Sequence, residues 1–371
     1  MTLTPSPASA FFASDPLGAD FRAAVAATLA DFLDDRTAQL LAVDPSLRPV
    51  ADAARSLADG GKRVRPGFAW WGRVAADARI DDPDELLRAV ASLDLLHAGL
   101  LVHDDLIDGA DTRRGLPAAH RRFAAEHRAD SAASGDPDAY GASGAILTGA
   151  LLMDWGMALF EESGLAPQRL DAARPTLLRM RQEVLAGQWL DLRAEHGLLA
   201  GHGPTGAAEQ IVRYKTALYT VARPLQLGAC LAGAGTDLVE GLGEFGTPLG
   251  RAYQWRDDLL DVFGDPAATG KPVGQDLRDA KPTLLVAQAL AHADAASTDR
   301  LRAVLGRADA TDADIDAARR VLVDTGARVR VEQAIARDHA VALRRLDDLP
   351  VTADGRAALV ELARLCVERD R

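Results

Sequence analysis

Several features are missing or scarce in this 371-residue sequence. It has only two cysteines, Cys230 and Cys366, which have neither the spacing of a metal site nor the number that a disulfide framework needs. They are expected to be small core side chains in a reducing compartment. Asparagine is absent altogether. Alternating runs of β-branched residues are also scarce, which argues against a protein built mainly of β-strands.

Excess positive charge and long apolar segments are lacking too. The net charge of −12 argues against nucleic acid or an anionic membrane surface as the main partner. No uninterrupted apolar stretch approaches the length of a membrane-spanning helix, so no stable membrane insertion is expected. Residues 1–16 have no basic start followed by an apolar core, which excludes a secretory signal and favours a disordered tail. We therefore expect a cytoplasmic protein.

Helix-forming residues dominate the rest of the chain. Alanine, leucine and arginine are abundant, and apolar residues recur at helical spacing. This pattern predicts an all-α, single-domain helical bundle over residues 17–371. Glycine, proline and small polar residues predict loops at 127–141, 197–206 and 264–282. Helices are predicted over 21–41, 84–108, 143–160, 174–192, 207–232, 238–262, 284–293, 297–305, 311–325, 329–346 and 353–368.

The sequence contains a duplicated cluster of aspartates, DDLID at 104–108 and DDLLD at 257–261. At about 100° per residue, the three aspartates of each cluster lie within an arc of about 100° on a helix. Like charges that close repel one another, and burying them unpaired is costly. A single cluster is usually a solvated helix face, but two copies on long apolar helices favour Mg²⁺ that bridges carboxylates to phosphates. The predicted metal ligands are Asp104, Asp105, Asp108, Asp257, Asp258 and Asp261.

Basic residues accompany both clusters. The segment GGKRVRP at 60–66 places three cations beside two glycines, where backbone amides can approach an anion and arginine can bind phosphate through its planar fork. Any one of these cations alone is at least as often a solvated surface charge. In a chain of net charge −12, their position near the carboxylates indicates binding of a polyanion through metals and direct contacts.

His97 and Gln254 are predicted to face the same spaces as the two clusters. His97 precedes Asp104 by seven residues, about 20° away around the helix, and Gln254 precedes Asp257 by about one turn. A lone histidine on an apolar helix is usually a core residue, but the shared face favours a functional role. His103 points about 100° away and is expected to be structural.

Taken together, the predicted residues suit a metal-bound diphosphate, a second anion held by lysine, arginine and histidine, and an apolar channel. Ionisation of an allylic diphosphate beside a second prenyl unit would need this combination.

Five segments in order between residues 60 and 285 give the sequence a resemblance to the trans-isoprenyl diphosphate synthases of the polyprenyl synthetase family. They are GGKRVRP at 60–66, LLHAGLLVHDDLIDGADTRRG at 95–115, EVLAGQWLDL at 183–192, YKTALYTVARPLQLGA at 214–229, and GRAYQWRDDLLDVFGDPAATGKPVGQDLRDAKPTLL at 250–285. The resemblance implies the isoprenoid synthase fold, a helical bundle around a central apolar cavity, usually as a homodimer. It also implies condensation of isopentenyl diphosphate with dimethylallyl, geranyl or farnesyl diphosphate, with three Mg²⁺ ions per active site.

The same resemblance implies roles for individual residues. Asp104, Asp108 and Asp257 are the more direct metal ligands, and Gln188 and Asp191 match a further motif near the metals. The implied catalytic residues are Lys215, Thr216, Gln254 and Lys271. The implied substrate-binding residues are Lys62, Arg65, His97 and Arg114 for isopentenyl diphosphate, and Arg113 and Lys281, with Lys215 and Lys271, for the allylic diphosphate.

Product length in the family depends on the depth of the cavity beneath the first motif. Gly99 leaves room where short-product members carry aromatic side chains, and Leu100 and Leu96 lie nearby on the same helix. We therefore expect a product longer than farnesyl diphosphate, namely geranylgeranyl diphosphate, with farnesyl or longer products left open. A class I terpene cyclase would carry an Asn/Asp-x-x-Ser/Thr-x-x-x-Glu second motif in place of DDLLD. A non-catalytic synthase subunit would tend to lose one aspartate motif.

Overall fold

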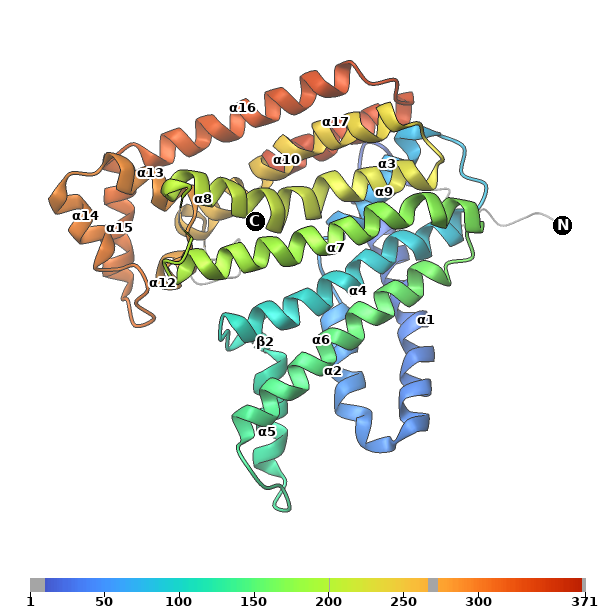
Figure 1. The fold of residues 1–371 in the computed structure, drawn as a ribbon, viewed down its shortest axis with the longest axis horizontal. Helices are drawn as coiled ribbons and strands as arrows, with labels where there is room; N and C mark the ends of the chain where they lie inside the picture. The colour runs from blue at the N-terminus through green and yellow to red at the C-terminus, as the bar shows by residue number, and fades with distance from the viewer. Residues whose placement is uncertain (1–10, 200, 266–272, 369–371) are drawn as a thin grey trace. The chain divides into compact units, whose positions relative to one another are not determined.

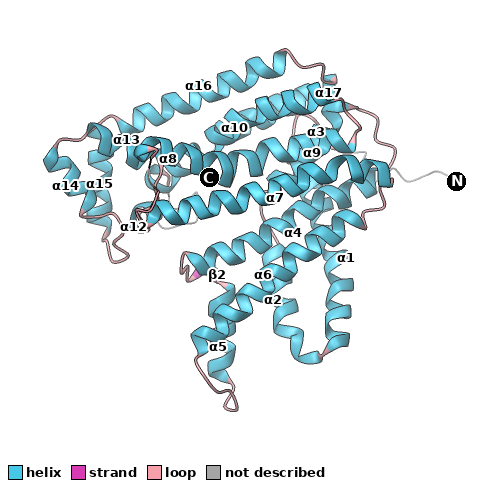
Figure 2. Cartoon of the chain, in the orientation of Figure 1, coloured by secondary structure: helices cyan, strands magenta, loops and turns pink. Residues whose placement is uncertain are grey.

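The structure is a computed structural model that describes residues 11–199, 201–265 and 273–368. Across these residues the chain is almost entirely α-helical, as Figures 1 and 2 show, which confirms the predicted fold class. The strands in the described part of the chain are β1 (Thr112–Arg113) and β2 (Leu116–Pro117), which pair antiparallel with Thr112 opposite Pro117. They form a short hairpin directly after the first aspartate motif.

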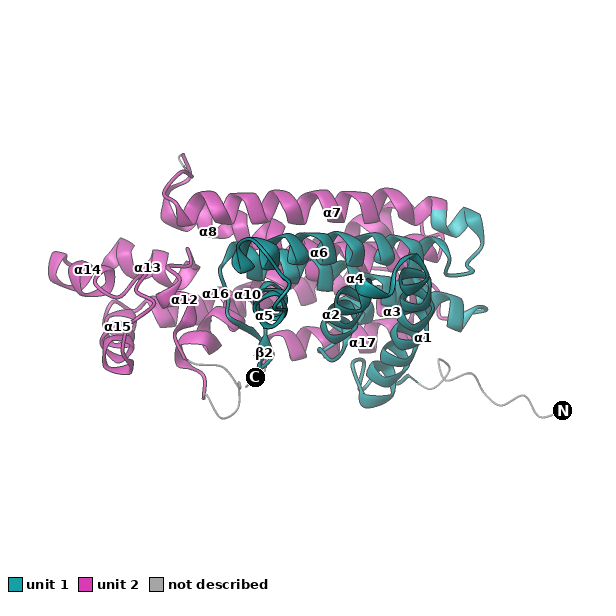
Figure 3. Cartoon of the chain, turned by 90° about the horizontal axis from the view of Figure 1, so that it is seen from below, with its two compact units in different colours: residues 1–70, 80–170 teal, residues 71–79, 171–371 magenta. Residues whose placement is uncertain are grey.

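The chain divides into two compact units, which Figure 3 colours separately. Unit 1 comprises residues 1–70 and 80–170, and unit 2 comprises residues 71–79 and 171–371. The sequence predicted one domain over residues 17–371, and the structure shows two compact units within this range. Each aspartate motif belongs to a different unit.

Unit 1 is built around the pairing of α4 with α6. Helix α4 begins with Pro83 in its first turn, followed by Asp84 and Glu85, which suit a helix N-terminus sterically and electrostatically. It ends at the first aspartate motif, where Gly109 adopts a left-handed conformation with φ of 64°. The helices of this unit are α1 (Ala19–Val43), η2 (Pro45–Leu47), α2 (Arg48–Ala58), the start of α3 (Val64–Ala76), α4 (Pro83–Ile107), α5 (Ala119–Ala129), α6 (Pro137–Glu161) and the start of α7 (Pro167–Glu195).

Glycines bring α4 and α6 into backbone contact. A Cβ added at Gly99 would lie 2.6 Å from the carbonyl oxygen of Gly149 and 2.7 Å from Cγ of Met153. A Cβ added at Gly156 would lie 2.8 Å from Cγ of Leu96. Real side chains do not tolerate such distances without movement of their neighbours, so this contact requires glycine on both helices.

The contact between α4 and α6 corrects the reason given for Gly99 as a product-length residue. The sequence suggested that the missing side chain leaves open space, but α6 occupies that space. Leu96 is only 1% exposed and belongs to the same contact, whereas Leu100 is half-buried. A role of these residues in product length stays a prediction, and Leu100 is now the better candidate.

Unit 2 is built around the long helix α10, which packs against η3, α9, α16 and α17. Its large core contains Trp255, Leu259 and Val262 from the helix that carries the second aspartate motif. The helices of this unit are the end of α3, most of α7, α8 (Gly203–Ile211), the π-helix η3 (Val212–Ala222), α9 (Arg223–Leu231), α10 (Thr236–Phe263), α12 (Gln275–Arg278), α13 (Leu284–His292), α14 (Ala295–Arg302), α15 (Asp312–Asp324), α16 (Ala327–Asp347) and α17 (Ala353–Val367).

Several predicted boundaries differ from the structure, for example the start of α7, which is Pro167 rather than residue 174. The helix predicted over 207–232 is divided into α8, the π-helix η3 and α9. The loop predicted over 127–141 is only 130–136, because α6 starts at Pro137 and the Asp136 side chain accepts a hydrogen bond from the Asp138 amide. Within the tail predicted over residues 1–16, the ring of Phe11 packs edge-on against Phe21 at 5.1 Å between ring centroids. Residues 1–10 lie outside the described residues.

By length and mean hydropathy, α4 and α6 would both be able to cross a membrane, contrary to the expectation from sequence. The most apolar windows of α4 and α6 are 67% and 44% buried within the protein, respectively. Core helices of soluble proteins pass the same length and composition test, so this finding is weak evidence for membrane insertion.

Candidate active site

The first aspartate motif ends α4, and its three carboxylates differ in exposure. Asp105 is only 1% exposed, Asp104 is half-buried and Asp108 is exposed. Arg113, on β1, returns to the motif, and its Nε donates to the two carboxylate oxygens of Asp105 at 2.8 and 3.1 Å. Burial raises the pKa of Asp105, while Arg113 opposes that shift. Arg113 therefore compensates the buried middle aspartate, and Asp104 and Asp108 are the more accessible carboxylates.

The basic loop lies beside Arg114. Gly60 and Gly61 have φ values of 70° and 93°, which favour glycine, and a Cβ on Gly61 would lie 3.1 Å from Nη2 of Arg114. The Arg114 guanidinium donates to the carbonyl of Asp59. Within the loop, Lys62 is exposed and Arg65 is half-buried. The structure thus brings the loop and the arginine after the first motif together, as the sequence predicted for one anion site.

His97 lies within the same electropositive group. Burial, followed by the charges of Arg65, Arg114 and Arg113, holds the pKa of His97 well below its ordinary value. Near neutral pH the imidazole of the ligand-free protein is therefore uncharged, and in that form it can donate a hydrogen bond to an anion. His103 lies apart, with Nε2 3.1 Å from the carbonyl oxygen of Ile146 on α6, in a structural contact.

The second aspartate motif repeats the exposure pattern of the first. Asp258 is only 4% exposed, Asp261 is half-buried and Asp257 is exposed. Gln254 donates through Nε2 to Oδ1 of Asp258 at 2.8 Å, and Thr216 donates through Oγ1 to Oε1 of Gln254 at 2.8 Å. This chain of hydrogen bonds joins η3 to α10 and fixes the orientation of the Gln254 amide. The structure therefore brings Thr216 and Gln254 together beside the second motif.

A pocket of about 170 Å³ in unit 2 is lined by Thr216, Gln254, Asp257 and Asp258, among other residues. Nζ of Lys215 lies 2.6 Å from Oδ2 of Asp191, and Nζ of Lys281 lies 3.5 Å from Oε1 of Glu195. Both predicted lysines are thus paired with carboxylates, and Lys281 and Lys215 line the same pocket. Sequence reasoning missed Glu195 altogether, and it missed Asp276, which also lines the pocket. Asp276 was within the family-like segment at 250–285, which was the available signal.

Carboxylates crowd this pocket. Burial, together with the charges of Asp257, Asp261 and Asp191, raises the pKa of Asp258 to about 8, although the hydrogen bond from Gln254 lowers it. Burial and the charges of Asp261 and Asp258 likewise raise the pKa of Asp276 well above its ordinary value. This is the like-charge crowding that the duplicated motif predicted.

The donor set fits a hard divalent cation. Each motif offers carboxylate oxygens at its two more accessible positions, and oxygen ligands are those that Mg²⁺ prefers. Across the residues that the structure describes, no group of three or more acidic, histidine or cysteine side chains is arranged to hold a metal by itself. Mg²⁺ bound here would therefore take further ligands from water and substrate phosphate, which is its usual behaviour.

The segment after the second motif folds back onto Asp261. The amide of Gly274 donates to the carbonyl of Asp261 at 2.8 Å, and the amide of Asp276 donates to its Oδ2 at 3.0 Å. Residues 266–272 lie outside the described residues, and Lys271, a predicted catalytic residue, lies among them.

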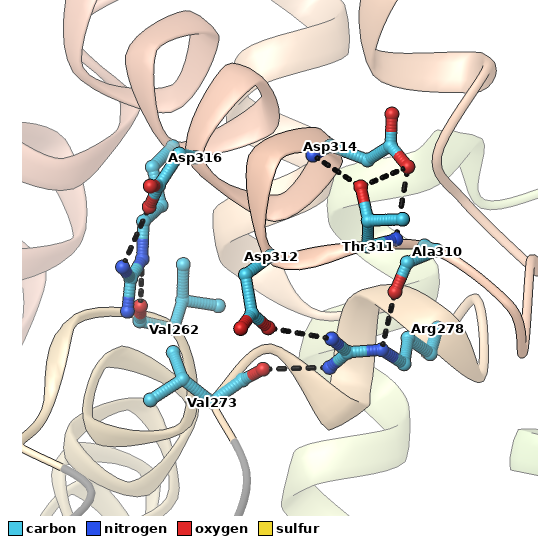
Figure 4. Close-up of polar contacts among 9 residues, drawn as sticks. Val262, Val273, Arg278, Ala310, Thr311, Asp312, Asp314 and Asp316 are labelled. Atoms are coloured by element: carbon cyan, nitrogen blue, oxygen red, sulfur yellow. Dashed lines mark hydrogen bonds and ion pairs between the residues drawn. The ribbon is translucent and has the colours of Figure 1, made fainter.

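Two arginines bind the chain at the two ends of this segment, and Figure 4 labels one of them, Arg278. Arg278 on α12 donates through Nη1 to the carbonyl of Val273 at 2.7 Å and through Nε to that of Ala310 at 3.2 Å. Arg319 on α15 donates through Nε to the carbonyl of Val262 at 2.6 Å, in the last turn of α10. A cation at this helix end is also favourable electrostatically. Thus α12 and α15 hold the chain at two points after the second motif, Val273 and Val262.

The π-helix η3 carries Lys215 and is held by glycines from two neighbouring helices. A Cβ on Gly187 of α7 would lie 2.4 Å from the backbone nitrogen of Lys215, and one on Gly250 of α10 would lie 2.5 Å from Cα of Ala217. No side chain fits at either position. π-Helical turns are rare and occur frequently at functional sites, which agrees with the predicted role of this segment.

Gly187→Ala is expected to displace the backbone of Lys215 and to lower both stability and activity. The clash should cost about 1–3 kcal/mol, which outweighs the gain of up to about 1 kcal/mol from replacing glycine in a helix. Thermal unfolding and kcat would test this. The matched control is Gly235→Ala, where no atom lies within 4 Å of the added Cβ. An unchanged melting temperature and kcat in Gly187→Ala would contradict the proposed close contact.

Asp258→Asn is expected to stabilise the metal-free protein increasingly as pH rises. The unfolded Asp258 carboxyl has a pKa of about 3.9, whereas that in the folded protein is raised to about 8. The folded state thus retains a proton that the unfolded state has lost, so wild-type stability falls as pH rises from about 4 to about 8, with no further loss above that. Asparagine stays neutral throughout.

Thermal unfolding in EDTA at pH 5 to 9 measures this difference. The gain of the variant over wild type should grow up to about pH 8, where it should reach several degrees. Asp237→Asn, which changes an exposed residue at the other end of α10, is the control and should show no such growth. Parallel curves for Asp258→Asn and wild type would show that Asp258 is charged in the folded protein.

Comparison with known proteins places the chain in a family. Residues 48–322 match the polyprenyl synthetase family, and the chain belongs to it. It is therefore a trans-prenyltransferase of the isoprenyl diphosphate synthase type, as the resemblance of its sequence segments implied. The match covers both aspartate motifs and all other predicted site residues.

Individual relatives agree on this class. The chain is 30% identical over 306 residues to geranylgeranyl diphosphate synthase of Methanosarcina mazei, which covers 81% of this chain and 85% of that protein. It is 32% identical over 349 residues to (2E,6E)-farnesyl diphosphate synthase of Mycobacterium bovis, and this match covers 88% of this chain and 87% of that protein. The chain also resembles a crystal structure of geranylgeranyl pyrophosphate synthase from Corynebacterium glutamicum, which is complexed with isoprenyl diphosphate and magnesium. The two structures have a TM-score of 0.88 and 38% sequence identity, and the match covers 94% of this chain and 98% of that one. These relatives confirm the isoprenoid synthase fold but differ in product length.

Proposed function

We propose that this protein is a Mg²⁺-dependent, chain-elongating prenyltransferase whose product is all-trans geranylgeranyl diphosphate. It condenses isopentenyl diphosphate with dimethylallyl, geranyl or farnesyl diphosphate. The observation that carries the proposal is the repeated exposure pattern of the two motifs, a buried middle aspartate between two more accessible ones. The magnesium and isoprenyl diphosphate bound by the Corynebacterium glutamicum relative support the assignment of metal and substrate class, and the family resemblance implies three Mg²⁺ ions.

The chain's own residues have separate tasks in this reaction. In unit 1, Lys62, Arg65 and Arg114 supply positive charge, and neutral His97 supplies a hydrogen bond, for the diphosphate of isopentenyl diphosphate. The accessible carboxylates of each motif would hold Mg²⁺, which would supply positive charge to stabilise the departing diphosphate.

In unit 2, the remaining basic and polar groups act on the allylic substrate. Lys215 and Lys281, with Lys271, bind the allylic diphosphate. The hydrogen-bonded pair Thr216 and Gln254 flanks the reacting carbons in an orientation that Asp258 fixes. Carbon–carbon bond formation is followed by loss of a proton to the released diphosphate, and apolar walls keep water from the allylic cation.

The test is incubation of the purified protein with Mg²⁺, isopentenyl diphosphate and each allylic primer, followed by chromatographic sizing of the product. A C20 product from all three primers is expected. A farnesyl or longer product would support the proposed reaction class but contradict the proposed chain length of the product. No elongation by the protein alone would overturn the proposal, and a cyclic hydrocarbon would favour a class I terpene cyclase.

We further propose that the enzyme works as a cytoplasmic homodimer. Support comes from large apolar side chains that are exposed on long helices, Leu147 on α6 at 67% and Trp189 on α7 at 60%. Such side chains are common at subunit interfaces. Light scattering after size-exclusion chromatography should give twice the mass of one chain, and Leu147→Asp should reduce it. A monomer at micromolar concentration would contradict the dimer.

A further inference from the structure

Arg63 differs from the other two cations of the basic loop. Lys62 is exposed and Arg65 is half-buried, whereas Arg63 is only 6% exposed. Its Nη1 donates to the carbonyl of Ala58 at 3.1 Å and to Oδ2 of Asp94 at 2.8 Å. Arg63 is therefore turned inward, away from any ligand of the loop, and binds helix α4.

The backbone at Arg63 shows why this inward turn matters. Its φ of 53° lies in the left-handed region, which disfavours any residue other than glycine, so the surrounding contacts must hold it there. The Arg63 carbonyl accepts a hydrogen bond from the Gly67 amide at 3.0 Å and so starts α3. The buried guanidinium thus fixes the turn between the exposed Lys62 and the first residues of the helix.

Asp94 connects this turn to the first half of the active site. It lies on α4, one turn before His97, and its side chain is 10% exposed. Burial raises the pKa of Asp94, and the charges of Arg63, Arg65 and Arg114 oppose that shift. The charges of Arg65 and Arg114 also act on His97. Asp94 therefore shares one electrostatic neighbourhood with the groups assigned to isopentenyl diphosphate, while its carboxylate accepts a hydrogen bond from Arg63.

We propose that Arg63 and Asp94 are positioning residues: their buried ion pair holds the basic loop at a fixed place on α4 and thereby sets the affinity for isopentenyl diphosphate. A buried ion pair is on average no more stabilising than well-packed apolar side chains, so fixing geometry is the role it fills best. Lys62 and Arg65 then meet the same diphosphate as His97 without a further ordering cost. This inference rests on the function proposed above.

The test is the effect of Asp94→Asn on the two substrates separately. The KM for isopentenyl diphosphate is expected to rise about tenfold, while kcat and the KM for farnesyl diphosphate change less than about twofold. The Kd for isopentenyl diphosphate, measured by calorimetry without Mg²⁺, should rise in parallel. Loss of a negative charge beside a bound anion would by itself lower the KM and the Kd for isopentenyl diphosphate. An increase in these two constants would therefore indicate lost positioning, and a decrease would indicate simple electrostatics.

Two further variants separate positioning from stability. Asp94→Glu keeps the charge and should restore most of the affinity. Arg63→Met with Asp94→Leu replaces the pair by apolar side chains, which should leave the melting temperature close to that of wild type, yet the raised KM should persist. The matched control is Asp338→Asn, which breaks a part-buried pair with Arg251 at 2.7 and 2.9 Å on other helices. It should leave both KM values unchanged.

The outcomes distinguish this inference from the proposed function. Absence of elongation by the wild-type protein would remove the proposed function. An active wild type with an unchanged or lowered KM for isopentenyl diphosphate in Asp94→Asn would overturn the inference alone. Equal increases in both KM values, or a normal KM in the apolar double variant, would also overturn it, because the pair would then act only through stability.

Discussion

Asp104→Ala and Asp257→Ala should each lower kcat by about 10³-fold or more while leaving the protein folded. Each residue is an accessible carboxylate of its motif, and its middle neighbour is buried. In the proposed reaction, removing either would take away an oxygen ligand for Mg²⁺ at the point where negative charge develops on the departing diphosphate. It also relieves repulsion within the motif, so the melting temperature of the metal-free variants should equal or exceed that of wild type.

The measurement is kcat at saturating substrate and Mg²⁺, together with thermal unfolding in EDTA. Asp111→Ala is the matched control for the first motif, because Asp111 lies three residues after it with a side chain that is 80% exposed. This control should keep normal turnover. Normal turnover in Asp104→Ala or Asp257→Ala would refute the assignment of that carboxylate to the metal, and a large fall in melting temperature would show a structural role instead.

The helical fold was predictable because its signals are local. Apolar periodicity and helix-forming composition predicted most helices, although α6 and α7 begin six and seven residues earlier than predicted. The π-helix η3 was not predicted, because its apolar residues also suit an α-helix and its geometry depends on close approach by Gly187 and Gly250. The early start of α6 was missed although Asp136 and Pro137 are good local signals, since the surrounding small residues suggested a loop.

The candidate site was predictable in its residue types and less so in their exposure. A helical wheel places three aspartates of each motif on one face, but it does not show that Asp105 and Asp258 are buried. That difference arises from partners, Arg113 for the first and Gln254 for the second. Similarly, no local pattern separates Arg63 from its neighbours in the loop, because its partner Asp94 is 31 residues away.

Gly99→Phe is expected to destabilise the protein strongly rather than simply to shorten the product. Even a Cβ at this position would lie 2.6 Å from the Gly149 carbonyl, so a benzyl group would force α4 and α6 apart. Overpacking of this size should cost about 3 kcal/mol or more, a fall of roughly 6–12 °C in melting temperature. Thermal unfolding and chromatographic product sizing on the same sample would separate instability from a change in product length.

Leu100→Phe provides the contrast, because it lies about 100° around α4 from Gly99 and is only half-buried. Its melting temperature should stay close to that of wild type, and its product should be shorter if the cavity floor lies on this face of the helix. A stable Gly99→Phe protein with a shortened product would instead restore the interpretation that Gly99 borders open space. The missing side chain of a glycine indicates a cavity only where no neighbouring backbone occupies the gap, and at Gly99 helix α6 does.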